Sequence, residues 1–235
     1  MPYFGLESEN MQLTALDINA DLGEVEGDYL ELIQIVSSAN LACGGHAGGG
    51  ELLRNAVVAA IQNGVMVGAH PSYPDQKNFG RVSMRGVISA DELLDLLKDQ
   101  VQTVVEELRN HDKKLNHIKA HGALYNDAMI YPDIAQILIE LAKGFDVPLL
   151  GLPNSTLEKL SKEHGIPFVA EGFVDRAFNA DGTLVARSIA GSVLTHEESL
   201  NQVRQIVTSG LVLSITGEIV PLEIKTLCVH ADTPD

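Results

Sequence analysis

Seven short apolar segments of this sequence alternate with stretches of helical spacing, and that alternation limits the possible folds more than any other feature. Apolar segments in such an alternation are typical of parallel strands that are buried on both faces. Strands and helices that alternate along a chain build α/β folds with a parallel sheet. The sequence therefore predicts an α/β chain with strands at residues 13–18, 39–43, 65–70, 117–122, 147–152, 167–170 and 226–229.

Helical spacing and capping residues predict the elements between these strands. Of the 235 residues, 45% are hydrophobic, and no linker or low-complexity tract divides the chain. We therefore expect one domain over residues 1–235, with a loose leader at 1–12. The predicted helices are 28–36, 51–61, 89–110, one that begins at 132, 155–164 and 196–209, and a small hairpin is predicted at 211–220.

Charge and composition exclude several classes of partner. The formal net charge of −16 argues against nucleic acid and against an anionic membrane surface. No apolar run approaches the roughly 20 residues of a membrane-spanning helix. The first residues carry no basic side chain, which argues against a signal peptide. Cys43 and Cys228 are too few for a disulfide framework. The predicted location is the cytoplasm.

Polar side chains follow six of the seven predicted strands. Four of the eight histidines, His46, His70, His121 and His230, each come after a different strand. The carboxyl ends of parallel strands share one face of an α/β fold, and binding sites form there. We therefore expect a single site on that face. Its further members are predicted to be Asp17, Asn19, Asp21, Glu24, Lys119, Asp175, Arg176 and Asp232.

The stretch from Cys43 to Gly50 holds five glycines and one histidine between a strand and a helix. Glycine allows the backbone to approach a ligand closely, and the N-terminus of the following helix offers unpaired N–H groups to an anion. The loop is thus either a plain glycine turn or an anion cradle. His46 is its predicted working residue, and Cys43 is predicted to be a buried spectator thiol.

Two chemistries suit a site rich in imidazole and carboxylate. Histidines and a carboxylate could hold a divalent metal that polarises a carbonyl and activates water, and His46, His70 and Asp21 are the candidate ligands. Alternatively, histidine and carboxylate could act as general acid and base without metal, while Lys119 or Arg176 stabilises negative charge. Either chemistry leads to hydrolysis of an amide-like bond.

The remaining conspicuous residues have structural interpretations. The histidines at 111, 117, 164 and 196 are predicted to be surface or capping residues, and Cys228 a core residue. Tyr73, Phe79 and Tyr125 either line the site or pack beside it. Asp28, Ser89 and Ser155 are predicted N-caps.

Several motifs taken together resemble one protein family. They are the stretches 17–24 (DINADLGE), 38–44 (SANLACG) with 46–48 (HAG), 68–71 (GAHP) with 73–75 (YPD) and 79–81 (FGR), 121–126 (HGALYN), 171–173 (EGF) with 175–176 (DR), and 228–230 (CVH) with 232–234 (DTP). In this order they resemble the LamB/YcsF family of 5-oxoprolinase A subunits over residues 13–234.

The resemblance implies a fold, an activity and partners. The fold would be a seven-stranded parallel β/α barrel, an irregular TIM-like barrel similar to the glycoside hydrolase/deacetylase superfamily. The activity would be ATP-dependent opening of 5-oxo-L-proline to L-glutamate, with ATP as cofactor and B and C subunits as partners. A homo-oligomer is also compatible with the sequence.

This sequence departs from the family pattern at several positions. The family usually has Phe at position 45, Asp at 49, Pro at 120, Arg at 82, and Gly at 72 and 231, and it continues with a last helix. Two alternatives therefore stay open beside the 5-oxoprolinase subunit. One is a metal-dependent deacetylase or amidohydrolase that acts on another lactam or amide. The other is a non-catalytic scaffold subunit.

Overall fold

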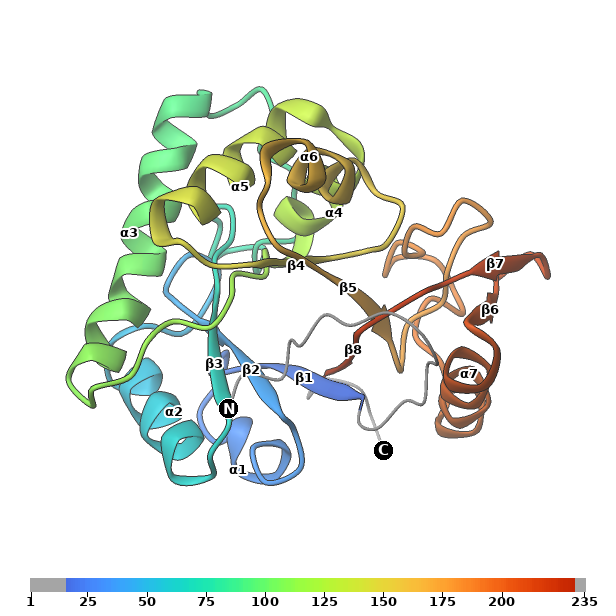
Figure 1. Cartoon of the computed structure of the whole chain (residues 1–235), viewed down its shortest axis with the longest axis horizontal. Helices are drawn as coiled ribbons and strands as arrows, with labels where there is room; N and C mark the ends of the chain where they lie inside the picture. The colour runs from blue at the N-terminus through green and yellow to red at the C-terminus, as the bar shows by residue number, and fades with distance from the viewer. Residues whose placement is uncertain (1–15, 231–235) are drawn as a thin grey trace.

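The computed structural model describes residues 16–230, and its centre is a curved parallel sheet in the order β3-β2-β1-β8-β5-β4 (Figure 1). The strands are β1 (Asp17–Leu22), β2 (Ser38–Ala42), β3 (Met66–His70), β4 (Leu149–Gly151), β5 (Phe168–Phe173) and β8 (Thr226–His230). Every pairing within this sheet is parallel. The predicted α/β class is thereby confirmed, while the leader predicted at 1–12 lies outside the described residues.

The prediction of a strand at 117–122 is wrong, because this segment pairs with the sheet at a single residue. Ile118 forms one parallel bridge to Ala69 of β3 and one to Leu149 of β4, so it lies between the two edge strands. Pairing ends soon afterwards, since Gly122 begins helix α4 (Gly122–Ile130), which the sequence did not predict. Within residues 16–230 the parallel sheet therefore has six strands rather than the expected seven.

Strand β1 runs through the polar motif that was expected to follow it. The strand covers Asp17–Leu22, whereas the prediction was 13–18, of which 13–15 lie outside the described residues. Successive side chains of a strand point to opposite faces. Ala20 and Leu22 are therefore buried on the outer face, and Asn19 and Asp21 on the inner face. Buried polar residues inside the strand broke the apolar pattern on which the prediction rested.

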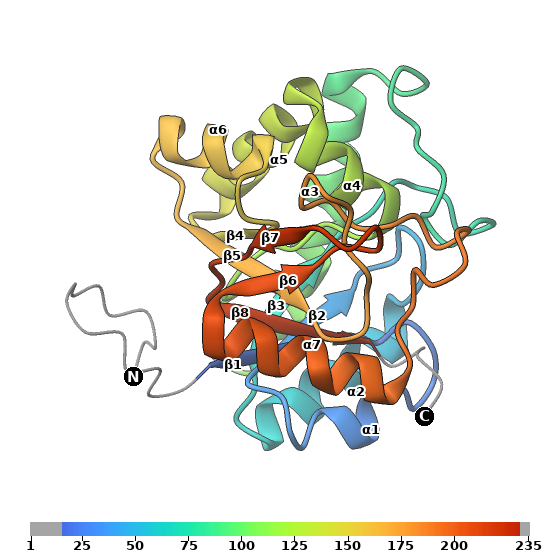
Figure 2. The ribbon, with the colours of Figure 1, turned by 90° about the vertical axis from the view of Figure 1, so that its right-hand side faces the viewer.

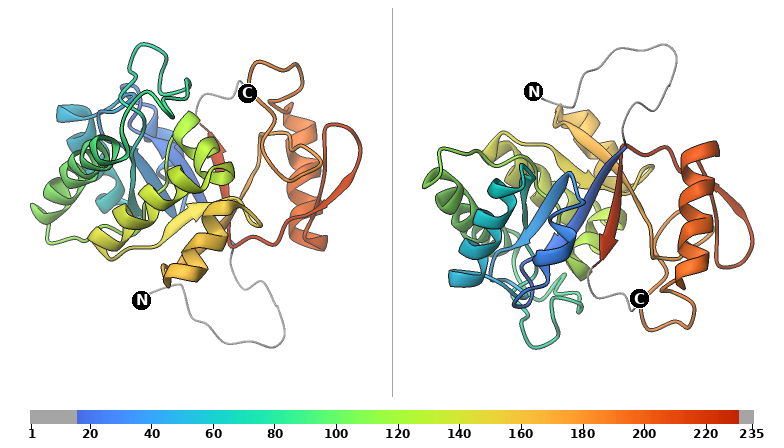
Figure 3. Two further views of the ribbon diagram at one scale, coloured as in Figure 1. Left: turned by 90° about the horizontal axis from the view of Figure 1, so that it is seen from above. Right: turned by 90° about the horizontal axis from the view of Figure 1, so that it is seen from below.

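The helices lie around the outside of the sheet (Figure 3). Helix α2 (Gly50–Gln62) packs on β2 and β3, α3 (Ala90–Arg109) on β3, α5 (Pro132–Phe145) on β4, and α6 (Thr156–His164) on β4 and β5. These four helices confirm their predictions, whereas the helix predicted at 28–36 is reduced to the short α1 (Tyr29–Leu32). No helix between residues 16 and 230 has the length and apolar character needed to cross a membrane.

The chain leaves the sheet after β5 and returns only at β8. In between, helix α7 (His196–Ser209) and the antiparallel hairpin of β6 (Leu211–Leu213) and β7 (Ile219–Pro221) lie to one side of the sheet (Figure 2). Both the helix and the hairpin were predicted. The stretch before α7 is irregular, and it reaches the cavity described below through Leu184, Ala186, Arg187 and Ser188.

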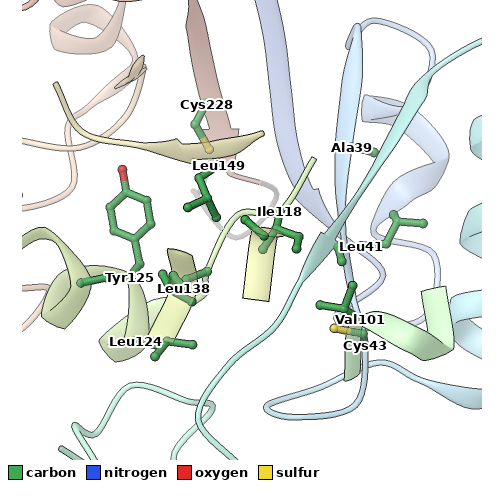
Figure 4. Packing of buried hydrophobic residues seen from close by; sticks show 14 of the residues in the cluster. Ala39, Leu41, Cys43, Val101, Ile118, Leu124, Tyr125, Leu138, Leu149 and Cys228 are labelled. Atoms are coloured by element: carbon green, nitrogen blue, oxygen red, sulfur yellow. The ribbon is translucent and has the colours of Figure 1, made fainter. Parts of the chain in front are cut away.

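One continuous apolar core fills the space between the sheet and its helices. It contains Leu41 and Ile118 from the sheet region and Val101 and Leu138 from the helices, all buried (Figure 4). Burial of a Leu or Ile side chain contributes about 1.5–3 kcal/mol to folding. This apolar core lies between the outer face of the sheet and the helices. The inner face of the sheet is thereby left to polar residues.

Two of the three predicted helix caps are confirmed. Ser89 and Ser155 accept hydrogen bonds from the N–H groups of Glu92 and Glu158. Asp28 is different, because its carboxylate makes no bond to helix α1. It accepts instead from the N–H groups of residues 23, 24 and 25 at 2.9, 2.8 and 3.1 Å. Asp28 thus fixes the loop that follows β1 and carries Glu24.

Candidate active site

Lys119 is the centre of a polar network that fills the inside of the sheet. Its Nζ lies 2.6 Å from Glu171 Oε2, 2.9 Å from Asp21 Oδ1 and 3.0 Å from Cys228 Sγ. Burial alone lowers the pKa of an ammonium group. The nearby carboxylates, Asp21 first, outweigh that effect and hold the pKa of Lys119 well above its ordinary value. Lys119 is therefore a permanently charged residue of the interior.

Asp21 links this network to the histidines. Its Oδ1 accepts from Asn40 Nδ2 at 2.8 Å and from Lys119, and its Oδ2 lies 3.3 Å from His70 Nε2. Burial raises the pKa of a carboxyl group, but His70 and Lys119 together lower the pKa of Asp21 well below its usual range. The carboxylate is thus ionised at neutral pH.

Three imidazoles and Glu24 meet beside Asp21. His70 Nε2 lies 3.0 Å from His121 Nδ1, and the ring of His46 stacks on that of His121 with centroids 3.5 Å apart. Glu24 Oε1 lies 2.9 Å from His46 Nε2 and 3.3 Å from His121 Nδ1. The sequence predicted that histidines from different strand ends meet, and three of the four form one cluster.

Burial and neighbouring charges give these three imidazoles different pKa values. It lowers the pKa of His46 to about 3 and that of His121 to about 2, and the neighbouring His70 adds to both shifts. His70 is also buried, but the Asp21 carboxylate outweighs that effect and raises its pKa. Burial therefore favours the neutral forms of His46 and His121, whereas Asp21 favours the charged form of His70.

The fourth histidine, His230 at the end of β8, pairs with Asp175 and does not join this cluster. His230 Nδ1 lies 2.8 and 3.0 Å from the two carboxylate oxygens of Asp175, and its ring stacks on Phe173 with centroids 5.7 Å apart. Its other nitrogen, Nε2, is turned toward Asp21 Oδ2 at 3.7 Å. A carboxylate bound to one imidazole nitrogen fixes the tautomer and leaves the other nitrogen to exchange protons.

These groups open onto a cavity of about 390 Å³. Acidic, basic and aromatic side chains all contribute to its wall. The lining residues are Asp21, Glu24, His70, Arg81, Lys119, Ala120, His121, Gly122, Ala123, Tyr125, Asn126, Phe173, Arg176, Leu184, Ala186, Arg187, Ser188 and His230. The cavity thus presents cationic groups to an anionic ligand despite the negative charge of the chain.

Not every predicted site residue reaches this cavity. Asp17 lies at the opposite end of β1, where it accepts from Ser38 Oγ at 3.1 Å and from Thr226 Oγ1 at 2.5 Å. Asn19 lies one layer above it and contacts Lys119 Nζ at 3.3 Å. Arg176 reaches the cavity wall, but its Nη2 also donates to Val185 O at 2.6 Å. Asp232 lies outside the described residues.

The aromatic candidates divide between the wall and the core. Tyr125 lines the cavity and donates from its hydroxyl to Glu171 Oε1 at 3.3 Å. Phe79 packs edge-on against His46 and His121, with centroids 5.2 and 5.5 Å away. Tyr73 is fully buried and donates to Asp127 at 2.8 Å, so it belongs to the core.

His117 is the clearest correction to the sequence interpretation. It was assigned to the surface, but it is buried and its Nε2 lies 2.6 Å from Asn40 Oδ1. Asn40 in turn donates to Asp21, so His117 helps to position Asp21 through Asn40. A side chain at Gly68 would overlap the His117 imidazole. Glycine inside a buried strand is the one sequence signal that could have pointed to this contact.

The glycine-rich loop serves packing more than ligand binding. None of residues 44–50 lines the cavity, and only His46 belongs to the cluster of three histidines and Glu24. A Cβ at Gly45 would collide with Ser72 Oγ and the side chain of Gln100. Cys43 is buried, and burial raises the pKa of its thiol to about 12, as expected of a spectator.

Two groups of side chains are arranged as metal ligands can be. Glu24, His46, His70 and His121 form one group, and Asp21, Cys228 and His230 the other. Within each group one donor atom per residue lies within 4.8 Å of the others. The predicted ligands His46 and His70 thus fall in one group, and Asp21 falls in the other.

Comparison with known proteins places this arrangement in a family. The sequence model of the LamB/YcsF family matches residues 16–235. The chain belongs to the LamB/YcsF family. The motif resemblance found in the sequence is thereby confirmed, and the match runs through all the strands that carry the site.

Named relatives of this family member cover most of its length. It is 40% identical over 226 residues to the 5-oxoprolinase A subunit of Campylobacter jejuni subsp. doylei, covering 92% of this chain and 88% of the relative. The same values hold for the protein of that name from Campylobacter jejuni subsp. jejuni serotype O:23/36. The crystal structure of the lactam utilization protein of Thermus thermophilus superposes with a TM-score of 0.86 and 36% identity, covering 93% and 91% of the two chains.

Proposed function

We propose that this LamB/YcsF protein is the A subunit of a 5-oxoprolinase, which opens 5-oxo-L-proline to L-glutamate with hydrolysis of ATP. The observation that carries the proposal is the buried acid–base network of Asp21, His70 and His230 at the wall of a cavity with cationic sides. The names of the Campylobacter relatives support the same substrate. B and C subunits are the proposed partners.

The proposed reaction explains why both acids and bases are needed. A lactam is a poor electrophile because its nitrogen donates electrons to the carbonyl. Phosphorylation of the carbonyl oxygen by ATP would make the ring carbon open to water. Attack by water then cleaves the C–N bond and leaves an acyl phosphate, whose hydrolysis yields glutamate and phosphate. The water must lose a proton and the ring nitrogen must gain one.

The site residues can be assigned to these proton transfers. His230 is the proposed base, since Asp175 fixes its Nδ1 and its Nε2 faces the cavity region near Asp21. His70 is the proposed acid when no ion occupies its Nε2, because Asp21 Oδ2 lies 3.3 Å from that nitrogen and favours the protonated imidazole. Among the cavity-lining cations, Arg81 and Arg187 are suited to the carboxylate of the substrate. The cavity volume of about 390 Å³ lies in the usual range for small-molecule sites.

A reconstitution assay tests the proposal. The purified chain would be combined with B and C subunits from the organisms of its relatives, with ATP and 5-oxo-L-proline. Glutamate and ADP should then form in equal amounts, and omission of this chain should abolish glutamate. ATP turnover without glutamate in every partner combination would contradict the proposed reaction.

A second candidate function is favoured by one observation, the convergence of Glu24, His46, His70 and His121. Such a donor set suits a metal-dependent amidohydrolase that works without ATP. The two functions are separated by leaving ATP and the partners out. Hydrolysis of a lactam or N-acetyl substrate by the chain alone favours the amidohydrolase, and strict dependence on ATP favours 5-oxoprolinase.

A further inference from the structure

We propose that Glu24, His46, His70 and His121 bind one divalent transition metal ion in tetrahedral geometry, with zinc as the best match. The donor atoms are Glu24 Oε1, His46 Nε2, His70 Nε2 and His121 Nδ1, one from each of four separate chain segments. Three imidazoles and one carboxylate are a donor set that zinc prefers in proteins.

The spacing of these atoms fits a zinc tetrahedron. Zinc–nitrogen bonds of about 2.0–2.1 Å place neighbouring ligand atoms about 3.3–3.4 Å apart. The observed separations are 2.9 Å for His46 Nε2 to Glu24 Oε1, 3.0 Å for His70 Nε2 to His121 Nδ1 and 3.3 Å for His121 Nδ1 to Glu24 Oε1. These three separations fit an ion, but the rings of His46 and His121 are parallel and stacked, so the His46 ring must turn for its Nε2 to face the ion.

Backbone contacts already orient two of the imidazoles. His70 Nδ1 lies 2.8 Å from the carbonyl oxygen of Lys119, and His121 Nε2 lies 3.0 Å from that of Phe79. A carbonyl can only accept, so these nitrogens carry the protons. The opposite nitrogens of both rings then point into the cluster. Metal-bound histidines commonly donate their second N–H to such a carbonyl, which fixes the ring and its tautomer.

A cation would relieve an unfavourable contact within the cluster. His121 Nδ1 and Glu24 Oε1 are both acceptors once His121 Nε2 carries its proton, yet they face each other at 3.3 Å. His46 is 2% exposed, and its Nδ1 has no hydrogen-bond partner among the described residues. The Nε2 contact with Glu24 is therefore the polar contact that positions His46. A metal ion would take the place of the proton on His70 Nε2 and would accept a lone pair from each of the four side chains.

The neighbouring group of Asp21, Cys228 and His230 is not expected to take a second ion. The ammonium of Lys119 already lies 2.9 Å from Asp21 Oδ1 and 3.0 Å from Cys228 Sγ. The Lys119 ammonium thus already occupies the Asp21 and Cys228 atoms that a metal ion would need as ligands. The predicted stoichiometry is therefore one ion per chain.

The location of the metal site gives it a use in amide chemistry. Glu24, His70 and His121 all line the cavity, and Asp21 Oδ2 lies 3.3 Å from His70 Nε2. When bound, the ion supplies a Lewis acid for a carbonyl or phosphoryl oxygen. Only this role rests on the proposed function, since metal binding itself can be measured without any substrate.

The test begins with the wild-type chain. Elemental analysis after purification, and titration of chelator-treated protein with Zn²⁺ by calorimetry, should give one zinc per chain and a raised Tm. Co²⁺ in place of zinc should give the intense visible absorption of a tetrahedral site. Folded protein that binds none of Zn²⁺, Co²⁺, Mn²⁺, Fe²⁺ and Ni²⁺ would overturn the proposal, whatever the reconstituted enzyme does.

Variants then assign the ligands. Glu24→Gln, His46→Ala and His121→Gln should weaken zinc binding by more than about 100-fold, because loss of outer-shell partners alone costs 10–100-fold. Cys228→Ser, from the neighbouring group, and His164→Ala, on the surface, are the matched controls and should keep one zinc. Loss of zinc in Cys228→Ser with retention in His46→Ala would overturn the ligand assignment. If the ligand variants fail to fold, the Co²⁺ spectrum of the wild-type chain decides.

Discussion

The ammonium of Lys119 lies 2.6 Å from Oε2 of Glu171, and the two side chains are 2% and 0% exposed. This buried ion pair is connected to the site, because the same ammonium also donates a hydrogen bond to Asp21. A buried charge without its partner is expensive. The stability of the fold therefore depends on Lys119, which also helps His70 to keep Asp21 ionised.

Replacing Lys119 by methionine should destabilise the protein strongly. The substitution leaves Glu171 and Asp21 buried without their cation, and loss of one partner of a buried pair costs about 3–5 kcal/mol. The free energy of unfolding from urea denaturation measures the effect. Lys119→Met with Glu171→Gln should recover part of the loss, since the second change removes an unpaired charge.

The matched control for this pair is Lys143→Met on the exposed side of helix α5. It should change the free energy of unfolding by less than about 0.5 kcal/mol. An equal loss of stability in Lys119→Met and Lys143→Met would refute the role of the buried pair.

Gly68→Ala should disturb the support beneath Asp21. A Cβ at Gly68 would overlap the His117 imidazole, whose Nε2 lies 2.6 Å from Asn40. Overpacking of this kind typically costs about 1–3 kcal/mol. Thermal and urea unfolding measure it, and His117→Ala in the same chain should relieve part of the cost because it removes the clashing ring.

Gly144→Ala is the control for Gly68→Ala. Position 144 lies near the end of helix α5, and a Cβ there meets no atom within 4 Å. Alanine should leave stability unchanged or raise it by about 0.5–1 kcal/mol, because glycine is the poorer helix former. If Gly68→Ala behaved like Gly144→Ala, the His117 contact would not constrain the strand.

The sequence predicted the outer face of the fold better than the inner face. The apolar periods of α2, α3, α5 and α7 reflect burial against the sheet, and their positions are confirmed. The inner face carries Asn19, Asp21 and Asn40, which bond one another across neighbouring strands. Polar residues on buried strands hide the strand period, because that period is read from hydrophobicity. For this reason β1 was placed too early.

Strand-end position predicted that histidines from different strands meet, but it neither separated His230 from the other three nor predicted their partners. His46, His70 and His121 were brought together as expected. Glu171 and His117 were missed, because a lone buried carboxylate or imidazole shows its role only through contacts distant in sequence. Lys119 reaches Asp21 across 98 positions of the chain. Such contacts follow from the curvature of the sheet, which no local pattern encodes.

Asp175→Asn should lower turnover in the reconstituted enzyme without loss of folding. The Asp175 carboxylate lies 2.8 Å from His230 Nδ1 and fixes the tautomer in which Nε2 can take a proton. An amide can present its N–H group to the ring instead, which favours the wrong tautomer. We expect kcat to fall by about 100-fold or more with a smaller change in KM.

Asp95→Asn, on the exposed side of α3, is the control for this substitution and should leave turnover unchanged. The comparison also tests the scaffold hypothesis. If Asp175→Asn and His230→Ala assemble with the partners and keep wild-type turnover, the chain is not catalytic, and its cavity serves binding alone.

Neither cysteine of the described chain should react in the native state. Burial raises the pKa of Cys43 to about 12, and burial together with Asp21 raises the pKa of Cys228 well above its ordinary value. The thiolate is the reactive form, so at pH 8 about one Cys43 in ten thousand is available. Treatment with a chromogenic disulfide reagent at pH 8 should therefore release no colour until guanidinium unfolds the protein. A Lys143→Cys variant supplies an exposed thiol that should react at once. Rapid native reaction of the wild-type chain would show that a cysteine is accessible and ionised, and would reopen its assignment as a spectator.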